Sequence, residues 1–253
     1  MSLYVIPRGG FGNVLFTYLI GSALSKKYNM PLYFVKRPDK RRVMSTYRIF
    51  KDCTFVDMPS ENIVWVKEPQ YWYNPVQING QKNNILDGYF QSFKYSQEYL
   101  AEIKRELFPA EPKLSQRPTV LLHVRRGDYL QLQDYHPVQN DDYYVRAIKI
   151  MQGRLKNPIF HVFSDDIDYM KNWDVLKGVD HEIIDVPDAE ECFHHMIRCD
   201  GFIIANSSFS LLAYYFRDNE DAPVCAPKLW FGSKGPKYKM EDLIEMGEFV
   251  DVI

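Results

Sequence analysis

From residue 119 onward, short apolar runs alternate with segments of helical pattern, and this alternation constrains the fold more than any other feature. The apolar runs are TVLLHV (119–124), IFHVF (159–163), HEIID (181–185) and GFIIA (201–205). Helical patterns lie at 141–153, 166–173, 189–199 and 208–216. Continuous apolar strands that alternate with helices are typical of a parallel sheet covered on both faces. The second half of the chain is therefore predicted to be a doubly wound α/β domain.

The beginning of the chain shows the same pattern. The apolar run LYVI (3–6) leads through the turn RGGFGN into a helical pattern over 14–28, and the run PLYFV (31–35) follows. Strand, helix and strand in this order indicate a βαβ unit of a parallel sheet. Weaker strand patterns at 53–57, 62–66 and 84–88 and a helical pattern at 96–108 complete the first half.

The segment PAEPKLSQRP (109–118) is rich in proline and polar residues and has the composition of a linker. It divides the chain into two predicted Rossmann-like domains, residues 1–112 and residues 113–253. We expect their parallel sheets to face each other across a central cleft.

Charge and hydropathy exclude several classes of protein. The 31 basic and 33 acidic residues give a net charge of −2, which is no footprint for nucleic acid or an anionic membrane. No apolar run approaches the roughly 20 residues of a membrane span, and the N-terminus lacks the pattern of a signal peptide. The four cysteines form no disulfide framework. These features predict a cytoplasmic protein.

A metal site is not expected. Cys192, His195 and Cys199 share one face of a predicted helix. Side chains of these types can ligate zinc. No fourth ligand is evident, and the same positions read as the buried face of the helix.

Polar side chains gather where three of the predicted strands of the second half end. In open α/β sheets, ligands bind beyond the carboxyl ends of the strands. We therefore predict one binding site from three clusters: His123, Arg125, Arg126 and Asp128; Ser164, Asp165 and Asp166; Asn206, Ser207, Ser208 and Phe209.

The chemistry of these clusters suits a guanosine diphosphate. Two guanidinium groups match the oxygens of a pyrophosphate, and hydroxyl and N–H groups at a helix N-terminus add an anion site. Guanine presents two adjacent N–H donors, which the carboxylates of Asp165 and Asp166 can accept. Two other interpretations stay open. Asp165, Asp166 and Ser207 can cap helices, and the arginines can form salt bridges with Asp128 or Asp134.

The early turn is a weaker signal. Gly10 and Gly12 allow close approach of a ligand to the backbone, and Asn13 lies at the start of the helix. The turn lacks the third glycine of the dinucleotide fingerprint and the lysine of a P-loop. A nucleotide-dependent oxidoreductase is therefore disfavoured.

Six stretches in order carry a resemblance to a known family: GGFGN, DGYFQSFKY, HVRRGDYL, FSDD, CDGFIIANSSFS and PKLWF. Over nearly its whole length the chain resembles the family 11 glycosyltransferases, the α-1,2-fucosyltransferases. The chain departs from the family pattern at Val14, where glutamine is usual, and at Leu211 and Leu212, where tryptophans are frequent.

The resemblance implies a two-domain GT-B fold and no metal ion. It implies inverting transfer of L-fucose from GDP-β-L-fucose to a hydroxyl of a glycan acceptor, with the 2-hydroxyl of a terminal galactose as first choice. Arg125 and Arg126 would bind the diphosphate, the ANSSFS loop would hold the nucleotide, and Asn13 would approach the donor sugar.

The proposed mechanism is electrostatic, since the arginines would stabilise the charge that grows on the departing diphosphate. Asp128 and Asp87 are the candidates for the general base. The aromatic residues Trp65, Tyr71, Trp72 and Tyr73 are platforms for acceptor sugars, loop anchors or core fillers.

Two alternative functions remain from the sequence. One is a fucosyltransferase of another linkage or with a protein acceptor. The other is a catalytically silent carbohydrate-binding protein, against which the intact pair of arginines argues.

Overall fold

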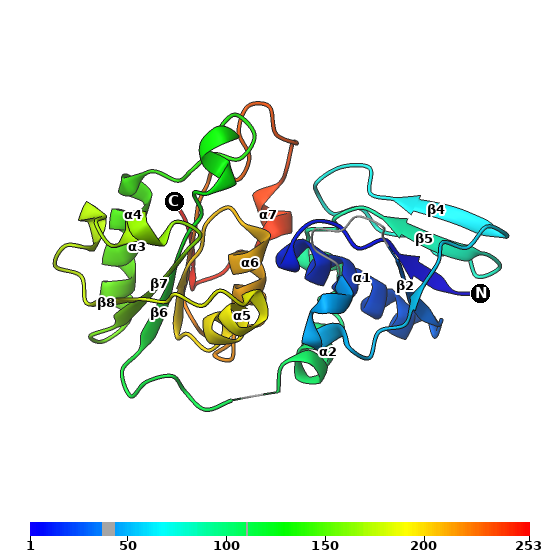
Figure 1. Ribbon diagram of the computed structural model, residues 1–253, viewed down its shortest axis with the longest axis horizontal. Coiled ribbons are helices and arrows are strands. Elements are labelled where there is room, and N and C mark those ends of the chain that lie inside the picture. Colours follow the sequence, from blue (N-terminus) through cyan, green and yellow to red (C-terminus); the bar gives the residue numbers. More distant parts are fainter. Residues whose placement is uncertain (37–43, 110) are drawn as a thin grey trace. The chain divides into compact units, whose positions relative to one another are not determined.

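The computed structural model describes residues 1–36, 44–109 and 111–253 (Figure 1). These residues form two compact units. Unit 1 contains Met1–Pro109 and Lys237–Ile244, and unit 2 contains Ala110–Pro236 and Glu245–Ile253. Each unit has its own β-sheet, and every strand pairing within the two sheets is parallel. Residues 111–118, which belong to the predicted linker, form no helix or strand.

Unit 1 contains a five-stranded sheet in the order β3-β2-β1-β5-β4. Its strands are β1 (Leu3–Val5), β2 (Leu32–Val35), β3 (Phe55–Val56), β4 (Ile63–Lys67) and β5 (Asn83–Asp87). Helix α1 (Phe11–Tyr28) connects β1 to β2, which pair in parallel, so the predicted βαβ unit is confirmed. The remaining elements are short: η1 (Met44–Thr46), η2 (Arg48–Phe50), η3 (Phe93–Tyr95), α2 (Leu100–Leu107) and α7 (Met240–Leu243).

Unit 2 contains a six-stranded sheet in the order β11-β10-β9-β6-β7-β8. Its strands are β6 (Thr119–Val124), β7 (Ile159–Ser164), β8 (His181–Ile183), β9 (Gly201–Ile203), β10 (Val224–Ala226) and β11 (Val250–Val252). Counted along this unit alone, the order is 3-2-1-4-5-6, which is the order of dinucleotide-binding sheets. The strand order reverses between β6 and β9, and such a switch point is where open α/β sheets bind ligands.

The helices of unit 2 lie on both sides of its sheet, α3 and α4 on one side and α5 and α6 on the other (Figure 1). They are α3 (Asp141–Arg154), α4 (Ile167–Met170), α5 (Ala189–Ile197) and α6 (Ser208–Tyr215), with short 3-10 turns η4 (Asp128–Gln131) and η5 (Asp174–Leu176). Each helix begins at a polar side chain that accepts a backbone N–H: Asn140, Asp166, Asp188 and Ser207. Such caps satisfy donors that the first turn leaves unpaired.

Strand β6 is the centre of unit 2, and all six of its residues are buried. Val120, Leu122 and Val124 pack in one cluster with the α3 residues Tyr143 and Tyr144. The residues between them point to the opposite face, because side chains alternate along a strand. The last of these is His123, whose ring lies 6.2 Å from that of Phe209 on α6.

The predicted pattern of the second half is confirmed, with two differences. The helix predicted at 166–173 ends at Met170, and a 3-10 turn follows it. Strands β10 and β11, of three residues each, were not predicted.

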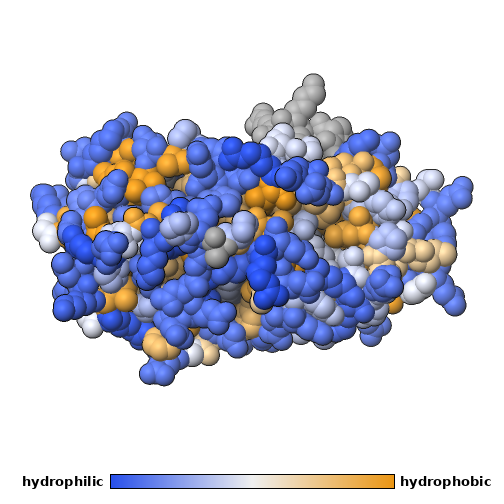
Figure 2. All heavy atoms as spheres, turned by 90° about the horizontal axis from the view of Figure 1, so that it is seen from below, coloured by the Kyte–Doolittle hydropathy of each residue, from blue (hydrophilic) through white to orange (hydrophobic). Residues whose placement is uncertain are grey.

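Hydrophilic side chains dominate the face seen in Figure 2, and its apolar residues lie in separate small groups. Among the helices that the structure describes, none is both long enough and apolar enough to cross a membrane.

The contact of α1 with its sheet leads to a stability prediction. A Cβ atom on Gly21 would lie 2.7 Å from Cγ2 of the buried Val5. We expect Gly21→Val to lower the free energy of unfolding by about 1–3 kcal/mol through overpacking. In Gly153→Ala, the matched control in α3, the new Cβ meets nothing within 4 Å. There the gain in helix propensity should raise stability by up to about 1 kcal/mol. Urea unfolding followed by circular dichroism measures both, and equal effects would contradict the packing argument.

Candidate active site

The polar clusters predicted from the strand ends lie along the edge formed by the ends of β7, β6 and β9 in unit 2. Strand β6 pairs with β7 along its whole length, with Val124 opposite Ser164, and with β9 on its other side. The residues that follow these three strands therefore share one edge of the sheet. The register places residues 125 and 126 beside Asp165 and Asp166.

Arg125 binds two carboxylates. Its Nη1 lies 2.7 Å from Oδ2 of Asp165, and its Nη2 lies 2.6 Å from Oδ1 of Asp128. The guanidinium also lies 5.2 Å from the ring centroid of Tyr129. Both terminal nitrogens of Arg125 are therefore engaged, and the predicted salt bridge with Asp128 is present.

Arg126 is held differently. Its Nε donates to Oδ2 of Asp166 at 3.0 Å, and its backbone N–H donates to Oδ1 of Asp165 at 2.9 Å. The guanidinium carbon lies 3.4 Å from the ring centroid of Tyr169, a cation–π stack. Among the described residues, none bonds to the two terminal nitrogens of Arg126. These nitrogens form the fork that could take a phosphate.

Gly127 allows the close approach of Asp165. A Cβ atom at this position would overlap Oδ2 of Asp165, closer than any ordinary contact of a Cβ atom. Any larger residue would therefore push away the carboxylate that bonds both Arg125 and the backbone of Arg126. This is the physical reason for the glycine in HVRRGDYL.

The capping interpretation is also present in the structure. Asp166 accepts from the backbone N–H of Tyr169 with Oδ1, while its Oδ2 binds Arg126. Ser164 accepts from the backbone N–H of Asp166, and Ser207 from that of Phe209. Ser208 is the first residue of α6. Asp134, the other proposed partner of the arginines, binds Lys234 instead.

Two buried side chains at the ends of β6 and β9 carry polar atoms without a protein partner among the described residues. These are Nδ1 of His123 and Oδ1 of Asn206. Burial, with Arg125 nearby, lowers the pKa of His123 to about 3, so its ring is neutral. The amide nitrogen of Asn206 donates to the carbonyls of Pro137 and Trp230, both at 3.0 Å. An unsatisfied buried atom costs free energy, and a bound ligand or water would reduce that cost.

Sequence reasoning missed two aromatic residues at this site. Tyr129 donates its hydroxyl to the carbonyl of Asn206 at 3.1 Å. His136 stacks on Tyr129 with ring centroids 4.7 Å apart, and burial lowers its pKa. Tyr129 is buried, in the turn directly after the arginines. Its place inside HVRRGDYL was the only signal that the sequence offered.

Cys192, His195 and Cys199 are not brought together as a group that could hold a metal ion in the described part of the chain. His195 and His161 share a hydrogen bond of 2.8 Å between their ring nitrogens, and burial lowers the pKa of His195 to about 4. Within residues 1–36, 44–109 and 111–253, no group of three or more His, Cys, Asp or Glu side chains could hold a metal ion.

In unit 1, the corresponding edge of the sheet holds an ion pair. Asp87, at the end of β5, accepts from Nε of Arg8 at 3.0 Å, and a second nitrogen of Arg8 contacts the same oxygen. Arg8 follows the neighbouring strand β1, so this candidate base is bound to a cation. Gly10 precedes α1 as its N-cap, and Gly12 is buried in the first turn of that helix.

The glycine turn of unit 1 is joined to the loop after β5. Asn13 accepts from Nε2 of Gln91 at 2.6 Å. The neighbouring residue Phe90 is buried at a φ of 51°, a rare conformation for a bulky side chain. Glu68 supports this turn, since its carboxylate accepts from the backbone N–H of Tyr89 at 2.7 Å and burial raises its pKa. No sequence motif indicated Glu68.

The aromatic residues proposed as an acceptor platform pack against different partners. Trp65 is exposed beside Lys67, whereas Trp72 lies against Lys239. Tyr71 stacks on Tyr89, and Tyr73 packs on Tyr95 with ring centroids 5.0 Å apart.

Comparison with known proteins extends this description. The model of the family described as Glycosyl transferase family 11 matches residues 26–242. An alpha-1,2-colitosyltransferase of Escherichia coli is 25% identical over 88% of this chain and 90% of its own length. A bovine galactoside alpha-(1,2)-fucosyltransferase 1 is 24% identical over 83% of this chain and 64% of its own length.

Among solved structures, the E. coli heptosyltransferase WaaC with ADP matches with a TM-score of 0.54. At 10% identity, this match covers all of the chain and 92% of WaaC, and it shows the fold alone. The two units with parallel sheets, together with this structural similarity, show that the chain has the GT-B fold. Since the family model spans most of the sequence, the chain belongs to glycosyl transferase family 11 and is a glycosyltransferase of the fucosyltransferase type.

Proposed function

We propose that the protein transfers L-fucose from GDP-β-L-fucose, with inversion, to the 2-hydroxyl of a terminal galactose on a glycan acceptor. One observation carries the proposal in a chain of this family. Two arginines and two aspartates meet at the ends of β6 and β7, next to the switch point between β6 and β9, in a sheet with dinucleotide-binding strand order. In this proposal unit 2 binds the donor and unit 1 contributes to the acceptor side.

Donor binding would rearrange the ion pairs. Arg125 and Arg126 face three carboxylates, those of Asp128, Asp165 and Asp166. An anionic diphosphate would reach Arg125 only after the carboxylates of Asp128 and Asp165 turn away from it, because like charges repel at close range. The terminal nitrogens of Arg126 would bind the diphosphate first. Asp165 or Asp166, once released from its arginine, would then accept hydrogen bonds from the N–H groups of guanine.

Catalysis in this proposal is the stabilisation of the leaving diphosphate by the two arginines. Asp128 holds Nη2 of Arg125 and so orients it for the leaving group. Asp128 and Asp87 both remain candidates for the base that takes the proton of the acceptor hydroxyl.

Colitosyl transfer is a second candidate, because the E. coli colitosyltransferase is similar along 88% of this chain. Colitose is L-fucose without its 3-hydroxyl. Comparing GDP-fucose with GDP-colitose as donors, at equal concentrations, separates the two activities.

The guanine assignment predicts a selective ligand effect on stability. GDP at a concentration about 100 times its Kd should raise the melting temperature by about 5–10 °C. UDP should leave it unchanged, because uracil has one ring N–H where guanine offers two adjacent donors. Asp165→Asn and Asp166→Asn identify the selecting residue by reduced shifts with GDP. Equal stabilisation by UDP and GDP would show the base assignment to be wrong.

The arginines should be sensitive to a conservative change. Lysine keeps the charge but loses the two-pronged donor geometry. We expect Arg125→Lys and Arg126→Lys each to lower the rate of fucosyl transfer about 100- to 1000-fold. Arg146→Lys is the matched control, since this arginine is exposed on α3 away from the cluster. If both site variants kept wild-type rates while folded by circular dichroism, the phosphate role would have to be abandoned.

Transfer should continue after chelation of divalent ions, because the arginines supply the positive charge that a metal would otherwise provide. The assay compares rates in EDTA with rates after addition of Mg²⁺ or Mn²⁺. A loss of turnover that either ion restores would contradict the proposed metal independence.

A further inference from the structure

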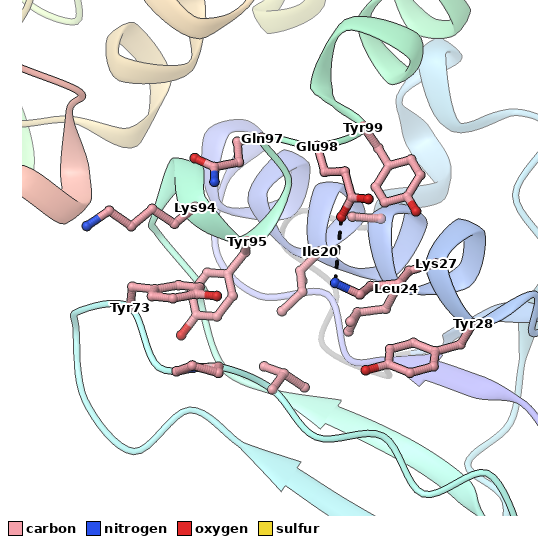
Figure 3. A pocket seen from close by; sticks show the side chains of 13 residues that line it. Ile20, Leu24, Lys27, Tyr28, Tyr73, Lys94, Tyr95, Gln97, Glu98 and Tyr99 are labelled. Carbon is pink, nitrogen blue, oxygen red and sulfur yellow. Dashed lines mark ion pairs between the residues drawn. The ribbon is translucent and has the colours of Figure 1, made fainter. Parts of the chain in front are cut away.

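Unit 1 contains a groove of about 360 Å³ at the surface, beside the second half of α1 (Figure 3). Ile20 to Tyr28 of α1 line one side, and the segments 73–76 and 94–99 line the others. This volume is within the range of small-ligand sites. All of the lining residues belong to unit 1.

Four tyrosines from three separate segments line the groove: Tyr28, Tyr73, Tyr95 and Tyr99. Tyr95 is fixed in place, since its hydroxyl accepts from the backbone N–H of Asn74 at 3.1 Å and its ring packs on Tyr73. Burial raises the pKa of Tyr95 to about 12, so its phenol stays neutral. Tyr28 is 43% exposed at the end of α1, and its ring is available to a ligand.

Each charged side chain that lines the groove is paired with a group of opposite charge. Lys27 and Glu98 form an ion pair of 3.6 Å across the groove, with both side chains more than half exposed (Figure 3). Such a pair adds little stability, so its donors and acceptors remain available to a ligand. Lys94 is bound to Asp242. The groove therefore has no excess charge that would select an anion.

Aromatic faces, an aliphatic floor and neutralised hydrogen-bonding groups together suit an uncharged sugar. The C–H face of a sugar ring can stack on a tyrosine, while its hydroxyls bond to Lys27, Gln97 or Glu98. A phosphorylated ligand would lack a cationic partner, and a purely apolar ligand would leave the charged rim unsatisfied.

The groove is separate from the glycine turn. At 1.5 Å per residue along α1, Ile20 lies about 10 Å and Tyr28 about 22 Å from Asn13. We infer that the groove is a second carbohydrate-binding site, which holds a neutral part of the acceptor glycan remote from the reacting hydroxyl. This inference rests on the proposed function for its link to the acceptor, but the binding itself does not require transfer.

Binding is tested directly on the full chain by isothermal titration and saturation-transfer NMR. The probes are three neutral tetrasaccharides: lacto-N-tetraose, maltotetraose and chitotetraose. Tyr28→Ala should weaken binding of the preferred probe about two- to tenfold, the range expected for loss of one stacking ring. Tyr28→Phe keeps the ring and should retain the affinity. Phe249→Ala, which removes an exposed ring from unit 2, is the matched control.

Kinetics provide the second measurement. Tyr28→Ala should raise KM for a preferred tetrasaccharide that ends in galactose, while kcat and the KM for free galactose stay unchanged. Failure of donor binding or transfer would count against the proposed function alone. The groove proposal is overturned if no probe binds at millimolar concentration, or if Tyr28→Ala binds every probe as the wild type does.

Discussion

Charge pairing between the ends of β6 and β7 organises the whole edge of unit 2. Asp165 accepts from the backbone of Arg126 and pairs with the guanidinium of Arg125, while Asp166 binds the side chain of Arg126. These contacts depend on the parallel register, which places Val124 beside Ser164. Partly buried arginines need such partners, because an unpaired charge there would cost several kcal/mol. Gly127 supplies the space in which the pairing forms.

The same carboxylates have structural and ligand-directed interactions at once. Asp166 caps α4 with one oxygen and binds Arg126 with the other. The two interpretations left open by the sequence, helix capping and ion pairing, are therefore compatible. In the proposed function, these ion pairs are replaced when the donor binds. The arginines then contact the oxygens of the nucleotide, and the carboxylates contact its N–H groups. An exchange of this kind would preserve much of the electrostatic balance of the site while the donor is bound.

The sequence predicted those parts of the structure that depend on short stretches of neighbouring residues. Continuous apolar strands such as 119–124 and 159–163 require a buried parallel sheet, and the polar residues that follow them must then meet at one edge. The partner of each charged side chain was not predictable, because it depends on which residues the fold brings close together in space. Asp134 pairs with Lys234, and Glu68 supports the turn at Phe90 from a neighbouring strand. Residues 237–244 return to unit 1, where Asp242 binds Lys94 and the backbone of Tyr73.

The ion pairs described at the strand ends differ between the two sheets. In unit 1, among the residues that the structure describes, Arg8 and Asp87 form an ion pair between the ends of β1 and β5. In unit 2, two arginines and three carboxylates meet at the ends of β6 and β7. Helix α6 begins after the neighbouring strand β9, and the backbone N–H groups of its first turn favour an anion. In the proposed function, the arginines of unit 2 bind the charged nucleotide. The tyrosine groove of unit 1 carries a balanced ion pair, and the phenol of Tyr95 is neutral. In the proposed function, unit 2 therefore binds the anionic donor, and unit 1 binds a neutral part of the acceptor.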